Sequence, residues 1–171
     1  MLSRIQLPSG AVCLDLGAGD GETVHVLREL GYQALGIDQL PGGDPVVRQG
    51  DFLDLQMDSE CVDLCISQCA FFVSGNPGKA LQEAWRVLKQ GGFLLLADLD
   101  PGDLEQLAVR AGYTVLERQD ITKLWQQYYI ESIWNDTLCC REYGSLIEKC
   151  RGKKLRYTVL ILGKGENDGS I

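Results

Sequence analysis

The sequence predicts an α/β domain whose core is a doubly wound, mostly parallel sheet of seven strands, and three observations support this. Residues 12–38 read as a strand, a glycine-rich turn, a helix and a second strand, which together form a β-α-β unit. Short apolar runs then alternate with helical patterns as far as residue 162. The 171 residues, 45% of them apolar, suffice for one buried core. We therefore expect one domain over residues 1–164 and a disordered polar tail over residues 165–171.

The β-α-β unit begins with the apolar run Val12–Leu16. Three glycines at alternate positions then predict a tight turn, because glycine adopts positive φ angles without strain: Gly17, Gly19 and Gly21. The helical pattern over residues 22–30 predicts three inward side chains: Val24, Leu27 and Leu30. The second strand, residues 34–37, ends at Asp38.

This unit predicts a pocket for a nucleotide-like ligand. Glycines let a ligand lie against bare backbone, and the free N–H groups at the start of a helix favour a negatively charged group. A carboxylate about 20 residues further on, at the tip of the neighbouring strand, can accept both hydroxyls of a ribose. Asp38 has that position.

The spacing of the glycines argues against a dinucleotide. A dinucleotide-binding turn has the pattern Gly-x-Gly-x-x-Gly, whereas the residue three after Gly19 is Glu22 and the third glycine comes two residues after Gly19. The carboxylate of Asp15 would repel a pyrophosphate and would suit an ammonium group. At these residues the chain resembles the class I S-adenosylmethionine-dependent methyltransferases, whose first motif is an acidic residue followed by Gly-x-Gly-x-Gly, with a second acidic residue at the next strand end.

The rest of the chain supplies five further strand candidates, over residues 46–52, 61–67, 93–97, 113–117 and 157–162. The run Cys61–Ser67 is nearly continuously apolar, which suits a strand buried on both faces. Its tip is expected beside the tip of the first strand, at the switch point where ligands bind in open α/β sheets. Helical patterns separate the strands, over residues 77–89, 100–111 and 121–150. The first of them has an apolar face: Ala80 or Leu81, Ala84, Val87 and Leu88.

A second resemblance comes from Arg86-Val87-Leu88-Lys89-x-Gly91-Gly92 before an apolar strand, which closely resembles the segment before the family's fifth strand. The chain departs from that pattern in having Gln90 where proline is common. The resemblance implies a Rossmann-like sheet whose last strand runs antiparallel between the fifth and sixth, and S-adenosylmethionine as the cofactor.

The resemblance also implies a set of cofactor-binding residues. Asp15 would face the methionyl ammonium, Asp38 the ribose hydroxyls, and Ser67 the methionine moiety. Asp51 and Phe52, which follow the third strand candidate, would contact the adenine. The backbone of the turn and of the residue after Asp38 completes the set: Gly17, Ala18, Gly19, Gly21 and Gln39. The resemblance assigns no catalytic residue.

The formal net charge of −8 argues against binding to nucleic acid or to an anionic membrane, because neutralising phosphates requires clustered Lys and Arg. One basic cluster lies within residues 149–156, and we interpret it as a solvated face, with an anion-binding patch as the alternative. The sequence shows no signal-peptide pattern and no apolar run of about 20 residues, so we expect a cytoplasmic protein. Seven cysteines, an odd number, indicate reduced thiols rather than a disulfide framework.

No metal site is expected. His25, the only histidine, lies in the helix after the glycine turn and is expected to face solvent. Cys61, Cys65 and Cys69 are spaced four residues apart. In a strand, this spacing puts the Cα atoms of one cysteine and the next about 13 Å apart, which is too far for them to share one ion. We interpret these cysteines as small core residues.

We expect a small-molecule methyl acceptor, and three other functions stay open. The adjacent Cys139 and Cys140 could serve a thiol- or metalloid-directed methyltransferase. A nicotinamide-dependent reductase would also place Asp38 at a ribose, although the glycine spacing opposes it. A catalytically silent scaffold is the third, and the intact glycines and Asp38 argue against it.

A segment of the protein must cover the bound cofactor, because in-line displacement at a sulfonium requires aligned reactants and excluded water. Only about ten residues precede the first strand, so we expect no N-terminal helices there. The aromatic segment Ile121–Cys150 is the candidate lid, and Trp125, Tyr128 and Tyr129 share one helical face at i, i+3 and i+4. That face either closes over the acceptor or packs on the sheet. If it does not close over the acceptor, the second subunit of a homodimer is the other candidate to cover the site.

Overall fold

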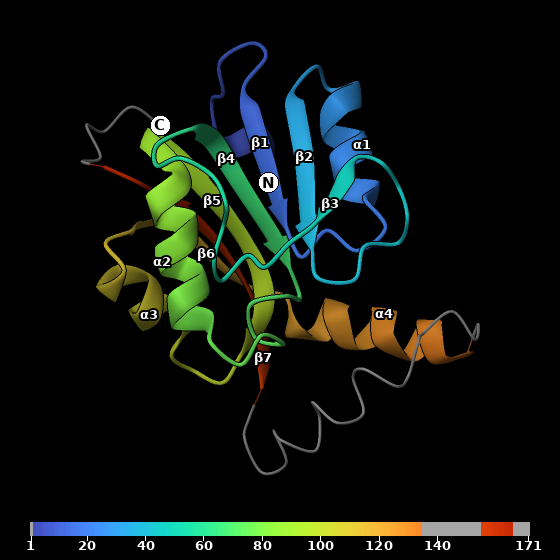
Figure 1. The fold of residues 1–171 in the computed structure, drawn as a ribbon. Helices are drawn as coiled ribbons and strands as arrows, with labels where there is room; N and C mark the ends of the chain where they lie inside the picture. The colour runs from blue at the N-terminus through green and yellow to red at the C-terminus, as the bar shows by residue number, and fades with distance from the viewer. Residues whose placement is uncertain (1, 135–154, 166–171) are drawn as a thin grey trace.

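The computed structural model of the protein describes residues 2–134 and 155–165. After a short 3-10 turn, η1 (Leu2–Arg4), seven strands form one sheet (Figure 1). The strands are β1 (Val12–Leu16), β2 (Gln33–Asp38), β3 (Val47–Gln49), β4 (Val62–Gln68), β5 (Leu88–Asp100), β6 (Thr114–Asp120) and β7 (Arg156–Gly163). The helices are α1 (Glu22–Glu29), α2 (Pro77–Val87), α3 (Leu104–Arg110) and α4 (Thr122–Trp134).

The strand order is β3-β2-β1-β4-β5-β7-β6. Strands β1 to β5 pair in parallel with one another, and β7 runs antiparallel to both β5 and β6. The predicted doubly wound sheet with its last strand antiparallel is therefore confirmed. Because the chain builds outward from β1 in one direction and from β4 in the other, the switch point lies between the carboxyl ends of these two strands.

Helices cover both faces of the sheet. Val24 and Leu27 of α1 are fully buried in one apolar cluster with residues of β1, β2 and β4, while α2 and α3 pack into a second cluster on the opposite face. Helix α2 begins where the sequence favours it, since the Asn76 side chain accepts a hydrogen bond from the Lys79 backbone N–H at 3.2 Å and Pro77 occupies the first turn. The residues predicted to form the apolar face of this helix are confirmed as buried: Ala80, Leu81, Ala84, Val87 and Leu88.

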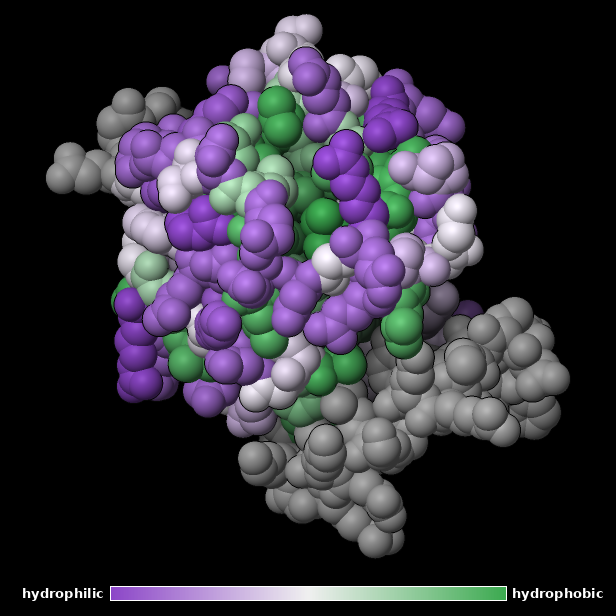
Figure 2. Space-filling model, viewed as in Figure 1, coloured by the Kyte–Doolittle hydropathy of each residue, from purple (hydrophilic) through white to green (hydrophobic). Residues whose placement is uncertain are grey.

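One part of the sheet has no helix over it. Residues 39–46 and 50–61 are irregular, so β1 and β2 are left partly open on the side of α2. A hollow of about 460 Å³ lies there, and its apolar lining includes Val12, Leu35 and Met57. Figure 2 shows apolar side chains gathered over this part of β1 and β2.

Two expectations about the first half of the chain are wrong. Leu30 was expected to point inward but is 58% exposed. Six residues turn a helix by about 600°, which leaves Leu30 about 120° around from Val24. The third strand ends at Gln49, so Asp51 and Phe52 follow the strand instead of ending it.

Two boundaries differ in the second half. Helix α2 ends at Val87, because Leu88 already has an extended backbone (φ −67°, ψ 136°) and pairs with Val62 in the sheet, so β5 begins five residues earlier than predicted. Helix α3 begins at Leu104 and not at Asp100. Asp100 ends β5 and its carboxylate accepts hydrogen bonds from the backbone N–H groups of Gly102 and Leu104. The predicted tail lies outside the described residues apart from Gly165.

Candidate active site

The carboxyl ends of β1 and β2 are joined through the glycine turn. The backbone N–H groups of Gly17 and Ala18 donate to the carbonyl oxygen of Ile37 at 2.9 and 3.2 Å. The N–H of Gly19 donates to Oδ2 of Asp38 at 2.9 Å. The acidic residue at the tip of β2 therefore fixes the middle of the turn at the tip of β1.

Asp38 also organises the two loops beside the turn. Its Oδ1 accepts a hydrogen bond from the Leu40 N–H at 2.8 Å, and its carbonyl oxygen accepts one from the Gly50 N–H at 2.9 Å. Gln39 is exposed next to it, and its carbonyl oxygen accepts a hydrogen bond from the Gln49 side chain. The sequence predicted a ligand-facing carboxylate at Asp38, and the structure adds that this carboxylate orders the surrounding backbone.

Asp15 is a buried carboxylate without a partner. The residue is only 3% exposed, and its carboxylate makes no hydrogen bond or ion pair with any residue in 2–134 or 155–165. Burial, and after it the negative charge of Asp38, raises the pKa of Asp15 to about 7. A buried charge without a counter-charge is unfavourable, so a cation beside Asp15 would stabilise the ionised form. These residues fit a ligand that brings an ammonium group to the end of β1.

Two glycines of the turn are required for different reasons. A Cβ at Gly17 would lie 2.3 Å from the Cβ of Ala70, so Gly17 is needed for packing against the segment that follows β4. A Cβ at Gly19 would meet no atom within 4 Å. The space beside Gly19 is open, and this is where a ligand can approach the bare backbone of the turn.

The two residues expected at the adenine lie just beyond β3. Asp51 is exposed, and its Oδ1 accepts a hydrogen bond from the Leu53 N–H at 2.8 Å. Phe52 is only 7% exposed and stacks on Phe71, with ring centroids 5.6 Å apart. Phe52 therefore belongs to the core beneath the glycine turn, and only a small part of its ring can reach a ligand.

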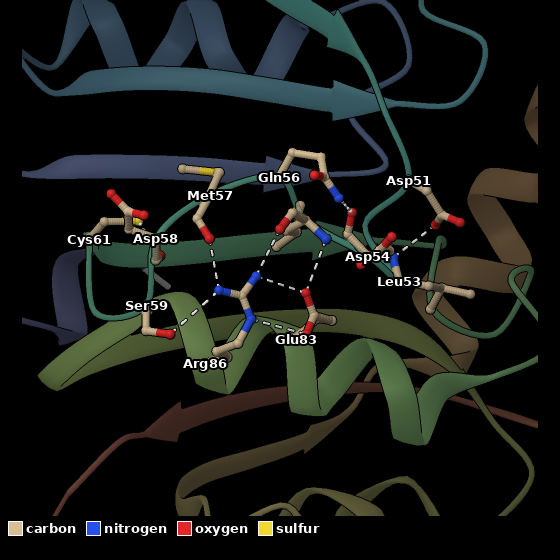
Figure 3. Close-up of polar contacts among 11 residues, drawn as sticks. Asp51, Leu53, Asp54, Gln56, Met57, Asp58, Ser59, Cys61, Glu83 and Arg86 are labelled. Atoms are coloured by element: carbon tan, nitrogen blue, oxygen red, sulfur yellow. Dashed lines mark hydrogen bonds and ion pairs between the residues drawn. The ribbon is translucent and has the colours of Figure 1, made fainter.

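The loop that carries Asp51 and Phe52 is held by α2. Figure 3 shows the Arg86 guanidinium donating to the carbonyl oxygen of Met57, at 2.8 Å. The guanidinium also donates to the carbonyl oxygen of Leu55 at 2.8 Å. Arg86 also pairs with Glu83 at 2.9 Å, and this hydrogen bond holds the pKa of Glu83 below its usual range. The Glu83 carboxylate in turn accepts the Leu55 N–H at 3.0 Å. Residues 50–61 form no helix, and hydrogen bonds to Arg86 and Glu83 of α2 hold this irregular loop in place.

Ser67 does not face the open space at the strand tips. The residue is completely buried, and its hydroxyl donates to the Leu16 carbonyl oxygen at 2.8 Å. Ser67 therefore supports the tip of β1 from within the sheet, and its expected position near a methionine moiety stays a prediction. The neighbouring Gln68 is exposed and donates to the Thr23 hydroxyl of α1 at 3.2 Å, so Gln68 is the side chain that β4 presents at its tip.

A second group of side chains lies at the carboxyl ends of β4 and β5. Cys69 has a left-handed backbone (φ 57°), and its Sγ lies 3.0 Å from the Tyr157 hydroxyl, which donates to the Ala97 carbonyl oxygen at 3.2 Å. The Trp125 ring of α4 stacks on Tyr157 with centroids 5.5 Å apart. Leu99 packs with them, and α4 lies beyond the ends of β1, β2 and β4 (Figure 1). Sequence reasoning missed this group, because Cys69 and Tyr157 are 88 residues apart.

In the described part of the candidate lid, one aromatic side chain is packed and another is exposed. Trp125 is partly buried against Tyr157, whereas Tyr128 is 68% exposed, so these two residues do not share one packed face. The side chain of Tyr129 and all of residues 135–150, with Cys139 and Cys140, lie outside the described residues. The described part of α4 therefore combines one core aromatic residue with an exposed surface.

Other predicted features have simple positions. His25 faces solvent as predicted, with its side chain 51% exposed and its Nε2 2.8 Å from Asp44. Cys65 is buried, and Cys61 and Cys69 are partly buried. Within the described ranges, no three His, Cys, Asp or Glu side chains gather as metal ligands, and no helix is long and apolar enough to cross a membrane.

Comparisons with known proteins agree with this geometry. A family model described as a methyltransferase domain matches residues 14–96. A malonyl-[acyl-carrier protein] O-methyltransferase from Yersinia pestis is 32% identical over 111 residues, which cover 60% of this chain and 42% of the relative. The chain thus spans less than half the length of that relative.

Solved structures share the fold at low identity. A putative sarcosine dimethylglycine methyltransferase from Galdieria sulphuraria matches with a TM-score of 0.71 and 22% identity, over 91% of this chain and 79% of that one. The [4+2]-cyclase SpnF matches with a TM-score of 0.72 and 19% identity, over 93% and 77% of the two chains. One fold therefore serves more than one reaction, and the reaction must be argued from the site. The family match, the glycine turn between its two acidic residues and the antiparallel last strand are all features that this chain shares with the class I S-adenosylmethionine-dependent methyltransferases.

Proposed function

We propose that the protein transfers a methyl group from S-adenosylmethionine, bound at the Asp15–Gly21 turn, to a small-molecule acceptor beside the carboxyl ends of β4 and β5. The observation that carries this proposal is Asp15, a buried carboxylate with a raised pKa and no partner among the described residues. When bound, S-adenosylmethionine supplies a methyl group on a positively charged sulfur.

The residues of the chain divide the work of binding and alignment. Asp15 pairs with the ammonium group of the donor, and the open backbone at Gly19 lets the donor lie close to the turn. Each oxygen of Asp38 accepts one backbone N–H and keeps a lone pair for a ribose hydroxyl. Asp51 is exposed beyond β3 and can accept the adenine amine. Gln68 and Cys69, at the tip of β4, border the space for the acceptor.

Calorimetry tests this proposal without knowledge of the acceptor. S-adenosylmethionine and S-adenosylhomocysteine are expected to bind with dissociation constants of about 1–100 μM, because the turn and its hydrogen bonds are already formed. The absence of both binding heat and a melting shift at about 1 mM ligand would contradict the proposal. Binding of a reduced nicotinamide dinucleotide in place of these ligands would favour the reductase.

The relative from Yersinia pestis favours a second acceptor class. Its printed substrate is malonyl-[acyl-carrier protein], and it is 32% identical to 60% of this chain. We propose the carboxylate of a malonyl thioester as the first acceptor to assay. Transfer of a labelled methyl group to a malonyl thioester, with acetyl thioester as a control that has no free carboxylate, decides this point.

A further inference from the structure

A second cleft lies at the other end of the sheet, between α3 and the outer strands β6 and β7. Its volume is about 460 Å³, which is within the range of small-molecule sites. Three arginines line it, one from each element: Arg110, Arg118 and Arg156. Such a group is unusual in a chain whose net charge is −8, and it makes this cleft locally attractive to anions.

Most N–H donors of these arginines are uncommitted. Arg118 uses Nε toward Glu105 at 3.2 Å, and Arg156 lies 3.7 Å from the nearest carboxylate oxygen of Asp100, which is beyond hydrogen-bonding distance. Arg110 makes no ion pair or hydrogen bond within residues 2–134 and 155–165. Each guanidinium has five N–H donors in a planar fork. The cleft therefore offers many more donors than its own carboxylates use.

The two carboxylates that line the cleft do not fill it, and a third, the exposed Asp120, interacts with Arg156 and Arg118 only from beyond the lining. Oδ1 of Asp100 already accepts the backbone N–H groups of Gly102 and Leu104, and its Oδ2 accepts the Thr158 hydroxyl at 3.1 Å. The Glu105 side chain is 48% exposed, so water screens its pair with Arg118. An anion that desolvates the arginines can compete with both.

The number of guanidinium groups selects the ligand chemistry. A carboxylate has two oxygens and is satisfied by one guanidinium fork, whereas a phosphoryl group has three oxygens that forks can approach from several sides. Val109 is 56% exposed in the same cleft and offers an apolar contact to an attached organic group. We propose that the cleft of Arg110, Arg118 and Arg156 binds the phosphoryl group of a phosphate ester.

This cleft is separate from the proposed methyl-transfer site. Arg156 and Tyr157 are consecutive in β7, so their side chains point to opposite faces of the sheet. Tyr157 contacts Cys69 and Trp125 on one face, and Arg156 lines the cleft on the face of α3. We therefore expect phosphate-ester binding to be independent of donor binding.

Calorimetric titration of the full chain tests this inference with three probes: inorganic phosphate, methyl phosphate and dimethyl phosphate. Methyl phosphate is expected to bind with a dissociation constant of about 1 mM or below. The variants Arg118→Gln and Arg110→Gln are each expected to weaken this binding by about tenfold, because each removes charge-assisted hydrogen bonds. Arg48→Gln is the matched control, since Arg48 is an exposed arginine of β3, at the opposite edge of the sheet.

The results distinguish phosphate monoesters from diesters as ligands, and they test phosphate-ester binding separately from the proposed donor binding. Binding of methyl phosphate without dimethyl phosphate indicates free phosphate monoesters, and equal binding of both indicates that a diester within a longer molecule is accepted. The inference is wrong if no probe binds, or if Arg110→Gln and Arg118→Gln bind as tightly as Arg48→Gln. S-adenosylmethionine titrated into the same variants reports the donor site independently, and its affinity is expected to stay unchanged.

Discussion

The proposed donor side and the proposed acceptor side of this protein are built in different ways. On the donor side, Asp15, Gly19 and Asp38 lie within 24 residues of sequence, in two strands that pair directly, and the Gly19 N–H donates to the Asp38 carboxylate. On the acceptor side, Cys69, Trp125 and Tyr157 come from three distant segments and meet through side chains. The donor side is therefore encoded locally, whereas the acceptor side exists only after β7 has inserted between β5 and β6 and α4 has docked beside it.

The largest effect is expected from Asp15→Asn. The neutral amide cannot pair with an ammonium group, so donor affinity should fall by about 100-fold or more. The same change should stabilise the ligand-free protein at pH 8 by about 1–3 kcal/mol, because it removes a buried charge that has no partner among the described residues. Calorimetry and thermal unfolding measure the two effects separately. If Asp15→Asn binds the donor normally, Asp15 does not face the ammonium group.

The second effect concerns Asp38, whose carboxylate serves both the ligand and the turn. Asp38→Ala should weaken donor binding by about 30–100-fold, because up to two charge-assisted hydrogen bonds are lost. It should also cost about 1–2 kcal/mol of stability, since the N–H groups of Gly19 and Leu40 lose their acceptor. Asp44→Ala, in the exposed loop nearby, is the control for a general loss of negative charge. Equal effects of the two variants would contradict a ribose role for Asp38.

The contrast between the two sides explains what could be predicted from the sequence. The strands and the parallel order follow from apolar runs and from Asp15-x-Gly17-x-Gly19, because these signals are local. The burial of Phe52 and Ser67 could not be read in the same way, since it depends on Phe71 and on the carbonyl of Leu16 in other strands. Local patterns identify strand tips, and tertiary packing decides which side chains at those tips face the ligand.

The acceptor side was predicted less well for the same reason. The sequence predicts Trp125 on a helical face that either packs on the sheet or closes over the acceptor. Its partner Tyr157 lies in a strand 32 positions later, and no local pattern reports that pairing. The shared face of Trp125 and Tyr128 was a helical-periodicity argument, and the exposure of Tyr128 shows that α4 contacts the sheet along a narrower line. Periodicity gives the direction of a side chain and not the presence of a neighbour.

A smaller effect on the donor side is expected from Arg86→Gln. The loop with Asp51 loses its two hydrogen bonds to the Arg86 guanidinium, so stability should fall by about 1–3 kcal/mol and donor affinity by about three- to tenfold. The apparent KM for the donor should rise more than kcat falls, because the loop contributes binding and not alignment of the acceptor. Lys79→Gln, exposed on the same helix, is the control and should change neither.

The smallest effect on the donor is expected on the acceptor side. Trp125→Ala should lower stability by about 1–3 kcal/mol, because Tyr157 loses the partly buried ring that stacks on it. The same change should alter donor affinity by less than about threefold. Tyr128→Ala, which removes an exposed ring from the same helix, should leave stability unchanged. If Tyr128→Ala lowers turnover on an identified acceptor while donor binding stays intact, the exposed face of α4 acts as a lid. Loss of donor binding in Trp125→Ala would show that the two sides are not independent.

The most direct test of the account is the pH dependence of donor affinity in the wild type and in Asp15→Asn. The Asp15 pKa is about 7 in the free protein, and an ammonium group favours the ionised form, so wild-type affinity should fall by about tenfold per pH unit as the pH decreases below 7. Stability has the opposite dependence on pH: the pKa of Asp15 in the folded protein exceeds its ordinary value of 3.8, so the stabilising contribution of Asp15 is fully present below pH 3.8 and is lost as the pH rises through 7. The account predicts an acid limb near pH 7 in the wild type and none in Asp15→Asn. The same acid limb in both proteins, or a flat wild-type profile between pH 5 and 7, would contradict the pairing of Asp15 with the donor.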